Sequence, residues 1–318
     1  MEIIVVDQRK VAMIGCGYVG AATAFALMES GLFSEMVLID ADQERAEGEA
    51  MDISHGLPFV RPMKIYAGDY DDIRDAAIII VTAGANQKPD ETRLDLVQRN
   101  VDIFKSIIPK IAERECEGIL LIVSNPVDIL TYTAWKLSGF PEHRVLGSGT
   151  VLDTARLKYN LGEHLNVDSR GVHAFVIGEH GDSELAAWSC ATVSGVPLNA
   201  FCEMRGHYDH EEATERIGED VKNSAYEIIK KKKATYFGVA MAVRRICEAI
   251  VRDEKSILPV SNLMHGEFGI GNIALSMPAI VGEKGVEKQV PLPLDDEEQE
   301  KLKLSAETLK KILEDVVW

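Results

Sequence analysis

Three residues near the middle of this 318-residue sequence carry side chains that could move a proton beside a bound anion. His180 lies in a glycine-bounded segment, residues 178–182 (GEHGD), and Asp153 and Arg156 precede it. A spacing of three places Asp153 and Arg156 on one face of a helix. If that face meets His180, the carboxylate orients the imidazole and favours its protonated form. Arg156 could then hold a carboxylate through two parallel N–H bonds, a task that lysine performs poorly.

Each of these residues also has a structural interpretation. A single histidine is more often structural than catalytic, and an Asp-x-x-Arg pair is more often a surface ion pair. The hypothesis of a proton donor beside an anion anchor therefore depends on the motifs that accompany it.

A glycine-rich turn follows the first apolar segment. Residues 10–14 (KVAMI) are typical of a strand, and residues 15–20 (GCGYVG) open an alanine-rich helical pattern. Glycine allows a tight turn and the close approach of a pyrophosphate, whose charge then lies at the helix N-terminus. The pattern predicts that a dinucleotide contacts Gly15, Gly17, Tyr18, Val19 and Gly20.

Asp40 closes the next apolar segment, about 20 residues further on, where a carboxylate can bind both ribose hydroxyls. Asp42 adds negative charge where a 2′-phosphate would lie, and no arginine is adjacent. The sequence therefore favours NAD over NADP as the cofactor.

Short apolar segments alternate with helical patterns in the first half of the chain. The predicted strands are residues 10–14, 36–39, 78–81, 119–123 and 145–146. The predicted helices are residues 18–30, 43–55, 96–115 and 127–137. This alternation predicts a Rossmann-type, doubly wound parallel sheet with helices on both faces, whose strands point their carboxyl ends at one crevice. We assign residues 1–150 to an NAD-binding domain.

The pattern changes after residue 150 to a mixture of helices and strands. Helices are predicted at residues 151–165, 211–230 and 236–251, and strands at 172–176, 186–193, 256–265 and 271–278. Asp295 and Glu298 have the spacing of a capping box and precede a closing amphipathic helix. We assign residues 151–318 to a mixed α+β substrate domain.

Composition excludes several classes of protein. The formal net charge is −17, which disfavours nucleic acid and anionic membranes as partners. The first residues lack the basic start of a signal peptide, and no apolar stretch reaches membrane-spanning length. The five cysteines are odd in number and never form a C-x-x-C pair, which argues against disulfides and zinc. We expect a cytoplasmic protein with reduced cysteines.

Two other segments could carry chemistry. His207 and His210 have a metal-like spacing, but the sequence indicates no third ligand, so we interpret them as part of a solvated loop and assign no metal. The basic run at residues 230–233 ends a predicted helix, where cations complement the helix dipole. We assign it no nucleic-acid role.

Several longer motifs occur in order along nearly the whole chain. They are residues 82–89 (TAGANQKP), 92–96 (TRLDL), 124–128 (SNPVD), 147–156 (GSGTVLDTAR) and 177–182 (IGEHGD). Together they resemble the successive signatures of the bacterial L-lactate dehydrogenases. The resemblance implies that His180 is the acid and base, that Asp153 is its partner and that Arg156 anchors the substrate carboxylate. It also implies that Arg93 lies on a mobile loop that closes over the substrate and polarises its carbonyl.

The resemblance extends to the cofactor and to the substrate. It places Thr235 beside the nicotinamide and the substrate, and Asn125 against the substrate oxygen. The positions assigned to the cofactor are Thr82, Ala83, Gly84, Ala85, Val123 and Asn125. A cation that follows the Gly84-Ala85 hinge and precedes a long helix also suits a lid, which agrees with the role implied for Arg93.

Substrate choice depends on Gln87, which the family aligns against the substrate side chain. A neutral amide leaves room for a methyl group, whereas the related malate dehydrogenases carry an arginine there. Pyruvate and L-lactate are therefore the expected substrates, in fermentative glycolysis. The alternative interpretation is that Gln87 is a solvated loop residue.

Many bacterial relatives bind fructose 1,6-bisphosphate at a subunit interface. The corresponding positions hold Lys158 and His173 here, and lysine lacks the bidentate fork of arginine, so this allosteric site is either weakened or absent. The resemblance also implies a homo-oligomer, either a dimer or a tetramer. Two other functions remain open: a dehydrogenase for malate or another L-2-hydroxy acid, and a non-catalytic NAD-binding protein.

Overall fold

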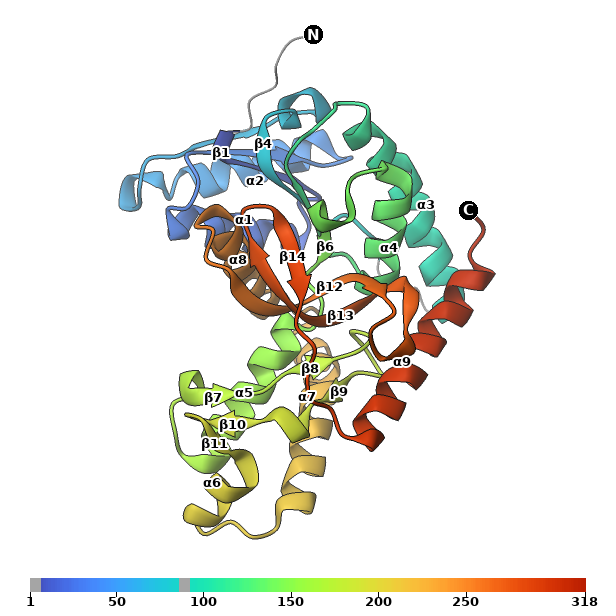
Figure 1. The fold of residues 1–318 in the computed structure, drawn as a ribbon. Coiled ribbons are helices and arrows are strands. Elements are labelled where there is room, and N and C mark those ends of the chain that lie inside the picture. The colour runs from blue at the N-terminus through green and yellow to red at the C-terminus, as the bar shows by residue number, and fades with distance from the viewer. Residues whose placement is uncertain (1–6, 86–91) are drawn as a thin grey trace.

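The computed structural model describes residues 7–85 and 92–318, apart from the side chain of Arg93. Within these residues, one nine-stranded sheet runs through the molecule (Figure 1). Its strands in spatial order are β14 (Gly285–Gln289), β13 (Gly271–Gly282), β12 (Ser256–His265), β6 (Val145–Gly147), β5 (Ile119–Ile122), β4 (Ala76–Val81), β1 (Asp7–Ile14), β2 (Glu35–Ile39) and β3 (Lys64–Ala67). The strands from β6 to β3 are parallel, and β12 to β14 are antiparallel to their neighbours. The parallel order 3-2-1-4-5-6 confirms the predicted doubly wound fold.

Helices connect the strands and cover the sheet. They are α1 (Tyr18–Ser30), α2 (Gln43–Ser54), α3 (Arg93–Ala112), α4 (Val127–Ser138), α5 (Val151–Leu165), α6 (Leu198–Met204), α7 (His210–Lys232), α8 (Phe237–Val251) and α9 (Asp296–Asp315). The predicted capping box of α9 is present, because the Asp295 carboxylate accepts from the Glu298 backbone at 2.8 Å. Among the described residues, no helix combines the length and the apolar character that a bilayer crossing requires.

Side chains of the central strands alternate between the two faces of the sheet. On β1, Ala12 and Ile14 belong to a core with α3, α4 and α9, whereas Val11 and Met13 belong to a core with α1, α2 and α8. This is the period of two that a strand buried on both faces must have. A third core joins α5 and α7 to small strands outside the main sheet. The arrangement matches the predicted helices on both faces.

Short strands form two smaller sheets beneath the main one (Figure 1). They are β7 (Val172–His173), β8 (Val176–Ile177), β9 (Leu185–Ala186), β10 (Thr192–Val193) and β11 (Val196–Pro197). The predicted continuous strand at 172–176 is wrong, because its ends pair in different sheets, β7 with β10 and β8 with β9. The predicted strand at 186–193 is wrong in its middle. There the Ser189 backbone donates to the buried Glu298 of α9 at 2.9 Å, and a 3-10 turn replaces the strand.

The sequence patterns did not predict α6, β3, β14 or the two-residue strand β11. α6 has only seven residues, and β3 lies at the sheet edge with no fully buried side chain. β14 likewise carries a mostly exposed pattern. Short or half-exposed segments give no clear apolar period, which is why they escape prediction.

The main sheet continues across the point where the chain enters its second half. β6 pairs with β12 through Gly147 and Ser261. Just beyond β6, Gly149 has φ of +51°, and a Cβ there would lie 2.5 Å from the Ser261 backbone nitrogen. α5 starts immediately afterwards, so its first turn is held close to the sheet. The division at residue 150 stays a prediction, since β12 to β14 complete a sheet that begins in the first half.

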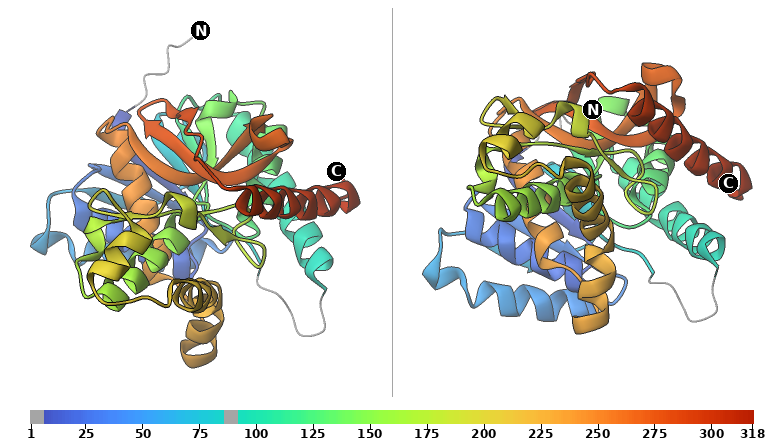
Figure 2. Two further views of the ribbon diagram at one scale, coloured as in Figure 1. Left: turned by 60° about the horizontal axis from the view of Figure 1, so that its bottom comes forward. Right: turned by 90° about the horizontal axis from the view of Figure 1, so that it is seen from below.

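The far end of the chain returns to α3. Both views of Figure 2 place the C-terminal end beside this helix. The Val317 carbonyl accepts a hydrogen bond from Lys105 at 2.6 Å, and the Val317 amide donates to Gln98 at 2.8 Å. The helix that begins at Arg93 is therefore tied to the last residues of the chain.

Candidate functional site

The Asp153 carboxylate joins the two other residues of the proposed chemical centre. Its Oδ2 lies 2.6 Å from Nδ1 of His180, and its Oδ1 accepts a hydrogen bond from Arg156 at 2.7 Å. Asp153 and Arg156 lie one turn apart at the start of α5, and His180 lies in the loop after β8. The side chain of Asp153 is only 2% exposed, so its pairing with Arg156 is not a surface ion pair.

The electrostatics of this cluster favour a charged imidazole. Burial disfavours the protonated ring, but the charge and hydrogen bond of Asp153 outweigh it and raise the pKa of His180 to about 9. Burial would raise the pKa of Asp153, yet His180 and Arg156 hold that pKa below its ordinary value. The pair is therefore an imidazolium and a carboxylate at neutral pH, with a proton ready for transfer.

A cavity of about 250 Å³ lies against the cluster. Its polar lining includes Asn125, Arg156 and His180, and its apolar lining includes Leu96 and Ile229. A volume below that of a drug-sized pocket suits a small acid. The cavity combines a proton donor, a guanidinium and an amide around one space.

The glycine-rich turn follows β1 with the geometry that a dinucleotide needs. Gly15 has φ of +102°, and a Cβ on it would lie 2.5 Å from the Ala83 nitrogen. A Cβ on Gly20 would lie 1.9 Å from the Gly15 oxygen. In contrast, a Cβ on Gly17, just before α1, would meet no atom within 4 Å. Two glycines thus close the turn, while the third leaves open space at the helix N-terminus for a pyrophosphate.

Asp40 stands at the carboxyl end of β2, as predicted, and also holds the glycine turn. Its Oδ2 accepts from the Cys16 backbone nitrogen at 2.6 Å, and its Oδ1 accepts from the Asp42 nitrogen at 3.0 Å. Each carboxylate oxygen has a further lone pair for a ribose hydroxyl. The residue therefore fits a nicotinamide dinucleotide without a 2′-phosphate.

Other residues assigned to the cofactor lie at the carboxyl ends of neighbouring strands. Thr82 follows β4 and donates its hydroxyl to the Gly15 oxygen at 2.7 Å, and Val123 follows β5. The Ala85 backbone nitrogen donates to the side-chain oxygen of the fully buried Asn100. The side-chain nitrogen of Asn100 donates to the backbone oxygen of Asn125 at 3.1 Å. Ala83 and Gly84, which are also assigned to the cofactor, follow Thr82 after β4.

Thr235 does not line the cavity that contains His180. It lies just before α8, next to Tyr236, whose ring stacks on that of Tyr18 with centroids 5.5 Å apart. Val19, beside Tyr18, packs against the core beneath α1 and α8. The neighbour of Thr235 therefore lies against the first residue of α1, and the role of Thr235 beside the nicotinamide and the substrate stays a prediction.

Comparison with known protein families agrees with a dinucleotide site at the glycine turn. The lactate/malate dehydrogenase NAD binding domain matches residues 9–147, and the lactate/malate dehydrogenase alpha/beta C-terminal domain matches residues 150–318. The chain belongs to the lactate/malate dehydrogenase family. Its cofactor is therefore NAD, as the sequence predicted.

Individual relatives are similar over nearly their whole length. The L-lactate dehydrogenase of Acetivibrio thermocellus is 54% identical over 96% of each chain, and L-lactate dehydrogenase 1 of Clostridium acetobutylicum is 52% identical over 97% of this chain and 99% of its own. Among solved structures, the minor L-lactate dehydrogenase of Enterococcus mundtii in its ligands-bound form has a TM-score of 0.94 at 43% identity. That comparison covers 97% of this chain and 98% of the other.

Two residues that the family resemblance singles out cannot be placed in full. Gln87 lies outside the described residues. For Arg93, the structure gives its position as the first residue of α3, directly after the Thr92 capping residue. Their roles stay predictions.

The sequence analysis missed residues that hold the family's histidine loop. Asp128 of α4 accepts from the His180 backbone at 2.7 Å, and Ser305 of α9 accepts from the Glu179 backbone at 2.9 Å. Glu184 is 5% exposed and lines the cavity. Burial and the nearby Asp153 charge raise its pKa to about 8. Asp128 closes the SNPVD motif and could have been noticed there, whereas Ser305 has no sequence signal.

The two positions of the doubtful allosteric site both lie after residue 150. Lys158 lies on α5 and is partly buried, and desolvation lowers its pKa. His173 is exposed at the end of β7. No described contact joins them, so the structure leaves the effector site as a prediction.

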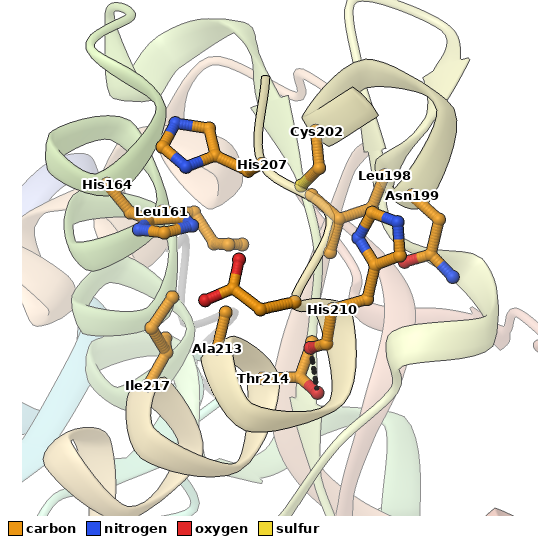
Figure 3. Close-up of a pocket in the computed structure, with 11 residues that line it drawn as sticks. Leu161, His164, Leu198, Asn199, Cys202, His207, His210, Ala213, Thr214 and Ile217 are labelled. Atoms are coloured by element: carbon orange, nitrogen blue, oxygen red, sulfur yellow. Dashed lines mark hydrogen bonds between the residues drawn. The ribbon is translucent and has the colours of Figure 1, made fainter. Parts of the chain in front are cut away.

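The histidines of the apparent metal motif line a small pocket at the other end of α5. His164 and His207 lie on one side of it, and Cys202 and His210 lie on the other (Figure 3). The rings of His164 and His207 are 4.5 Å apart, and both His207 and His210 are partly buried. The expected solvated loop holds only in part: His207 lies in a loop but is partly buried, and His210 begins α7 with its ring 3.2 Å from the Glu203 carboxylate.

Within residues 7–85 and 92–318, Asp153, His180 and Glu184 form the one group whose ligand atoms are close enough for a metal. However, both oxygens of Asp153 are already bound, one by Arg156 and one by His180. A cation there would compete with the Arg156 guanidinium and the His180 ring for the same carboxylate. The geometry supports proton transfer rather than metal binding.

Proposed function

We propose that this protein interconverts pyruvate and L-lactate with NAD, as an L-lactate dehydrogenase of fermentative glycolysis. The observation that carries the proposal is the pair of hydrogen bonds that joins Asp153 to His180 and to Arg156 beside a cavity of about 250 Å³. The curated relatives named above, which carry this activity in their names, support the choice of substrate.

His180 is the proton donor in pyruvate reduction and the acceptor in lactate oxidation. Its Nδ1 is engaged by Asp153, so the transferred proton is the one on Nε2. Asp153 remains ionised and stabilises the imidazolium before it gives up the proton. NAD, when bound at the glycine turn, supplies or accepts the hydride.

Arg156 anchors the substrate carboxylate. One terminal nitrogen of its guanidinium is bound to Asp153, which leaves the rest of the planar group for the ligand. Asn125 would contact the reacting oxygen from the cavity wall. Arg93 would polarise the carbonyl from the closing loop, which also excludes water.

One spectrophotometric assay tests the proposal. NADH oxidation is measured across pyruvate, oxaloacetate and branched 2-oxo acids. We expect the highest kcat/KM with pyruvate. A preference for oxaloacetate would support a malate dehydrogenase, and no oxidation with any 2-oxo acid would support a non-catalytic NAD-binding protein.

Gln87 provides the sharper test of substrate choice. We expect Gln87→Arg to shift the preference from pyruvate toward oxaloacetate, because a guanidinium would pair with the second carboxylate. Relative kcat/KM values for the two acids are the measurement. An unchanged ratio would refute the role of Gln87.

Regulation by fructose 1,6-bisphosphate would use Lys158 and His173. Lysine offers a point charge without the arginine fork, which weakens binding of a bisphosphate. A titration of rate against the sugar bisphosphate at low pyruvate distinguishes an activated enzyme from an unregulated one.

The protein is also proposed to be a cytoplasmic homo-oligomer, a dimer or a tetramer. Large apolar side chains on α1, α2 and α8 are exposed, among them Phe25 at 56%, Met51 at 64% and Met241 at 54%. A second copy would cover them. The five cysteines are free, which fits a reducing compartment. Light scattering after size exclusion gives the copy number.

A further inference from the structure

A lysine at the end of α7 lies over two aromatic rings rather than beside a carboxylate. Nζ of Lys232 is 3.6 Å from the ring centroid of Tyr236 and 4.4 Å from that of Phe237. Its neighbour Lys231 pairs with Glu227 at 2.8 Å. In the part of the chain that the structure describes, no carboxylate forms an ion pair with Lys232. Its charge is therefore available to a ligand.

The end of α7 directs this lysine toward the rings. Lys233 closes the helix with φ of +74°, and its backbone nitrogen donates to the Ile229 oxygen at 2.7 Å. A left-handed conformation is uncommon for a lysine and persists where the surrounding structure holds it. The chain then turns back, so that Tyr236 meets the side chain of Lys232 just before α8 begins. The placement of Lys232 is thus built into the connection between the two helices.

The same rings lead to the glycine turn. Tyr236 stacks on Tyr18 with centroids 5.5 Å apart and planes inclined by 19°. Tyr18 is the first residue of α1 and follows Gly17, where a Cβ would meet no atom within 4 Å. That open space at a helix N-terminus suits a pyrophosphate. Two stacked rings therefore connect the Lys232 cation to the edge of the dinucleotide site.

The glycine turn needs positive charge from another part of the chain. Residues 15–30, which form the turn and α1, contain no lysine or arginine. The Asp40 carboxylate binds the turn at Cys16, and the chain has a formal net charge of −17. An anionic dinucleotide meets repulsion from these charges, against the favourable dipole of α1. A cation beside the turn would offset that repulsion.

We propose that Lys232 is a cofactor-binding residue, which supplies positive charge to the NAD pyrophosphate and is held at the edge of the site by the rings of Tyr236 and Tyr18. The other lysines at the end of α7 complement the helix dipole, a role that needs no aromatic contact. A cation–π contact fixes the ammonium group without neutralising it, so the charge still acts on a bound anion. This role concerns cofactor binding and does not depend on which 2-oxo acid is the substrate.

Removing the charge of Lys232 gives the first test. We expect Lys232→Gln to raise the Kd for NADH about three- to fivefold at an ionic strength of about 10 mM, as for a partly exposed charge interaction. Lys232→Arg keeps the charge and stacks well on aromatic rings, so it should keep the wild-type Kd within about twofold. Calorimetric titration of the protein with NADH is the measurement. A wild-type Kd in Lys232→Gln would overturn the proposal.

The matched control is Lys230→Gln. Lys230 is exposed in the same last turn of α7 and has no ring contact among the described residues. This variant changes the net charge of the protein equally and should leave the Kd for NADH unchanged. An equal loss of affinity in both variants would show a general effect of net charge, and Lys232 would then have no specific role.

Salt separates lost charge from lost packing. The difference in Kd between the wild type and Lys232→Gln should disappear at about 1 M salt, where exposed charges are screened. A difference that persists there would show that the side chain acts through packing on the rings, against the proposal.

A second ligand locates the charge on the cofactor. ADP-ribose carries the pyrophosphate without the nicotinamide, so Lys232→Gln should weaken the binding of ADP-ribose and of NADH by the same factor. A loss with NADH alone would overturn the assignment to the pyrophosphate.

Light scattering completes the test, because Tyr18 and Phe237 are 68% and 66% exposed, and a second copy of the chain would also cover such rings. We expect the copy number to be the same in the wild type and in Lys232→Gln. A changed copy number would make the rings a subunit contact and overturn the proposal.

Discussion

The two ends of α5 hold histidines in opposite circumstances. At the first turn, Asp153 bonds to His180 and raises its pKa to about 9. At the last turn, His164 lies against the His207 ring, and burial together with the His207 charge lowers its pKa. Nε2 of His164 is buried and has no hydrogen-bond partner among the described residues, in contrast to Nδ1 of His180. The same side chain is a proton carrier in one place and a neutral packing group in the other.

The difference shows that the neighbours of a histidine decide its chemistry. A carboxylate that binds one ring nitrogen makes the imidazolium stable and leaves the other nitrogen for a ligand. A second imidazole and apolar side chains make the charged form costly. The pocket at the last turn has a volume of only about 10 Å³, room for about one water, against 250 Å³ at the first.

Replacing the histidine at each end of α5 by asparagine tests this contrast most directly. We expect His180→Asn to lower kcat by about 10²- to 10⁴-fold, the range of general acid catalysis, and His164→Asn to leave kcat unchanged. Steady-state rates with pyruvate and NADH give the answer. Near-normal turnover of His180→Asn would remove the proposed mechanism.

At the start of α5, Arg156 is proposed to bind the substrate carboxylate. Arg156→Lys keeps the charge but loses the planar fork, so we expect a loss of about 1.5–3 kcal/mol, roughly 10- to 150-fold in kcat/KM for pyruvate. KM for pyruvate should account for most of the loss, and the Kd for NADH serves as the control. A wild-type KM for pyruvate would show that another group binds the carboxylate.

The pH dependence sharpens the electrostatic side of the comparison. Pyruvate reduction needs protonated His180, so its kcat/KM should stay level below about pH 9 and fall tenfold per pH unit above it. Lactate oxidation needs the neutral ring, so its kcat/KM should rise about tenfold per pH unit up to about pH 9 and level off above it. Parallel profiles for the two directions would contradict the assignment of His180.

The smallest expected effect concerns stability at the other end of the helix. Because the folded pKa of His164 lies below its ordinary value of 6.5, the unfolded chain takes up the proton first as the pH falls. The folded state should therefore lose stability below about pH 6.5. The Tm of the wild type should fall by about a few degrees between pH 7.5 and pH 5.5. We expect this fall in Tm to be smaller in His164→Asn than in the wild type. An equal acid-induced change would show that His164 titrates normally.

Sequence reasoning predicted the parts of the fold that have a clear period. The buried strands and long helices of the first half were recognisable from local pattern, as was the cap of α9 at Asp295. The strand expected at 186–193 failed because the buried Glu298 binds the Ser189 backbone from a distant helix. A local pattern cannot contain a partner more than 100 residues away.

The sequence by itself determined which chemical groups are available: the glycine turn that opens α1, Asp40 after β2, and the set of Asp153, Arg156 and His180. These are encoded by residue type and short spacing, which survive in any fold that keeps the local elements. Only the tertiary structure decided that one carboxylate bridges His180 and Arg156, and that Asp128 holds the His180 backbone across 52 positions of sequence. Such contacts follow from how sheet and helices pack, because hydrogen bonds between distant segments depend on their placement in space and not on their order along the chain.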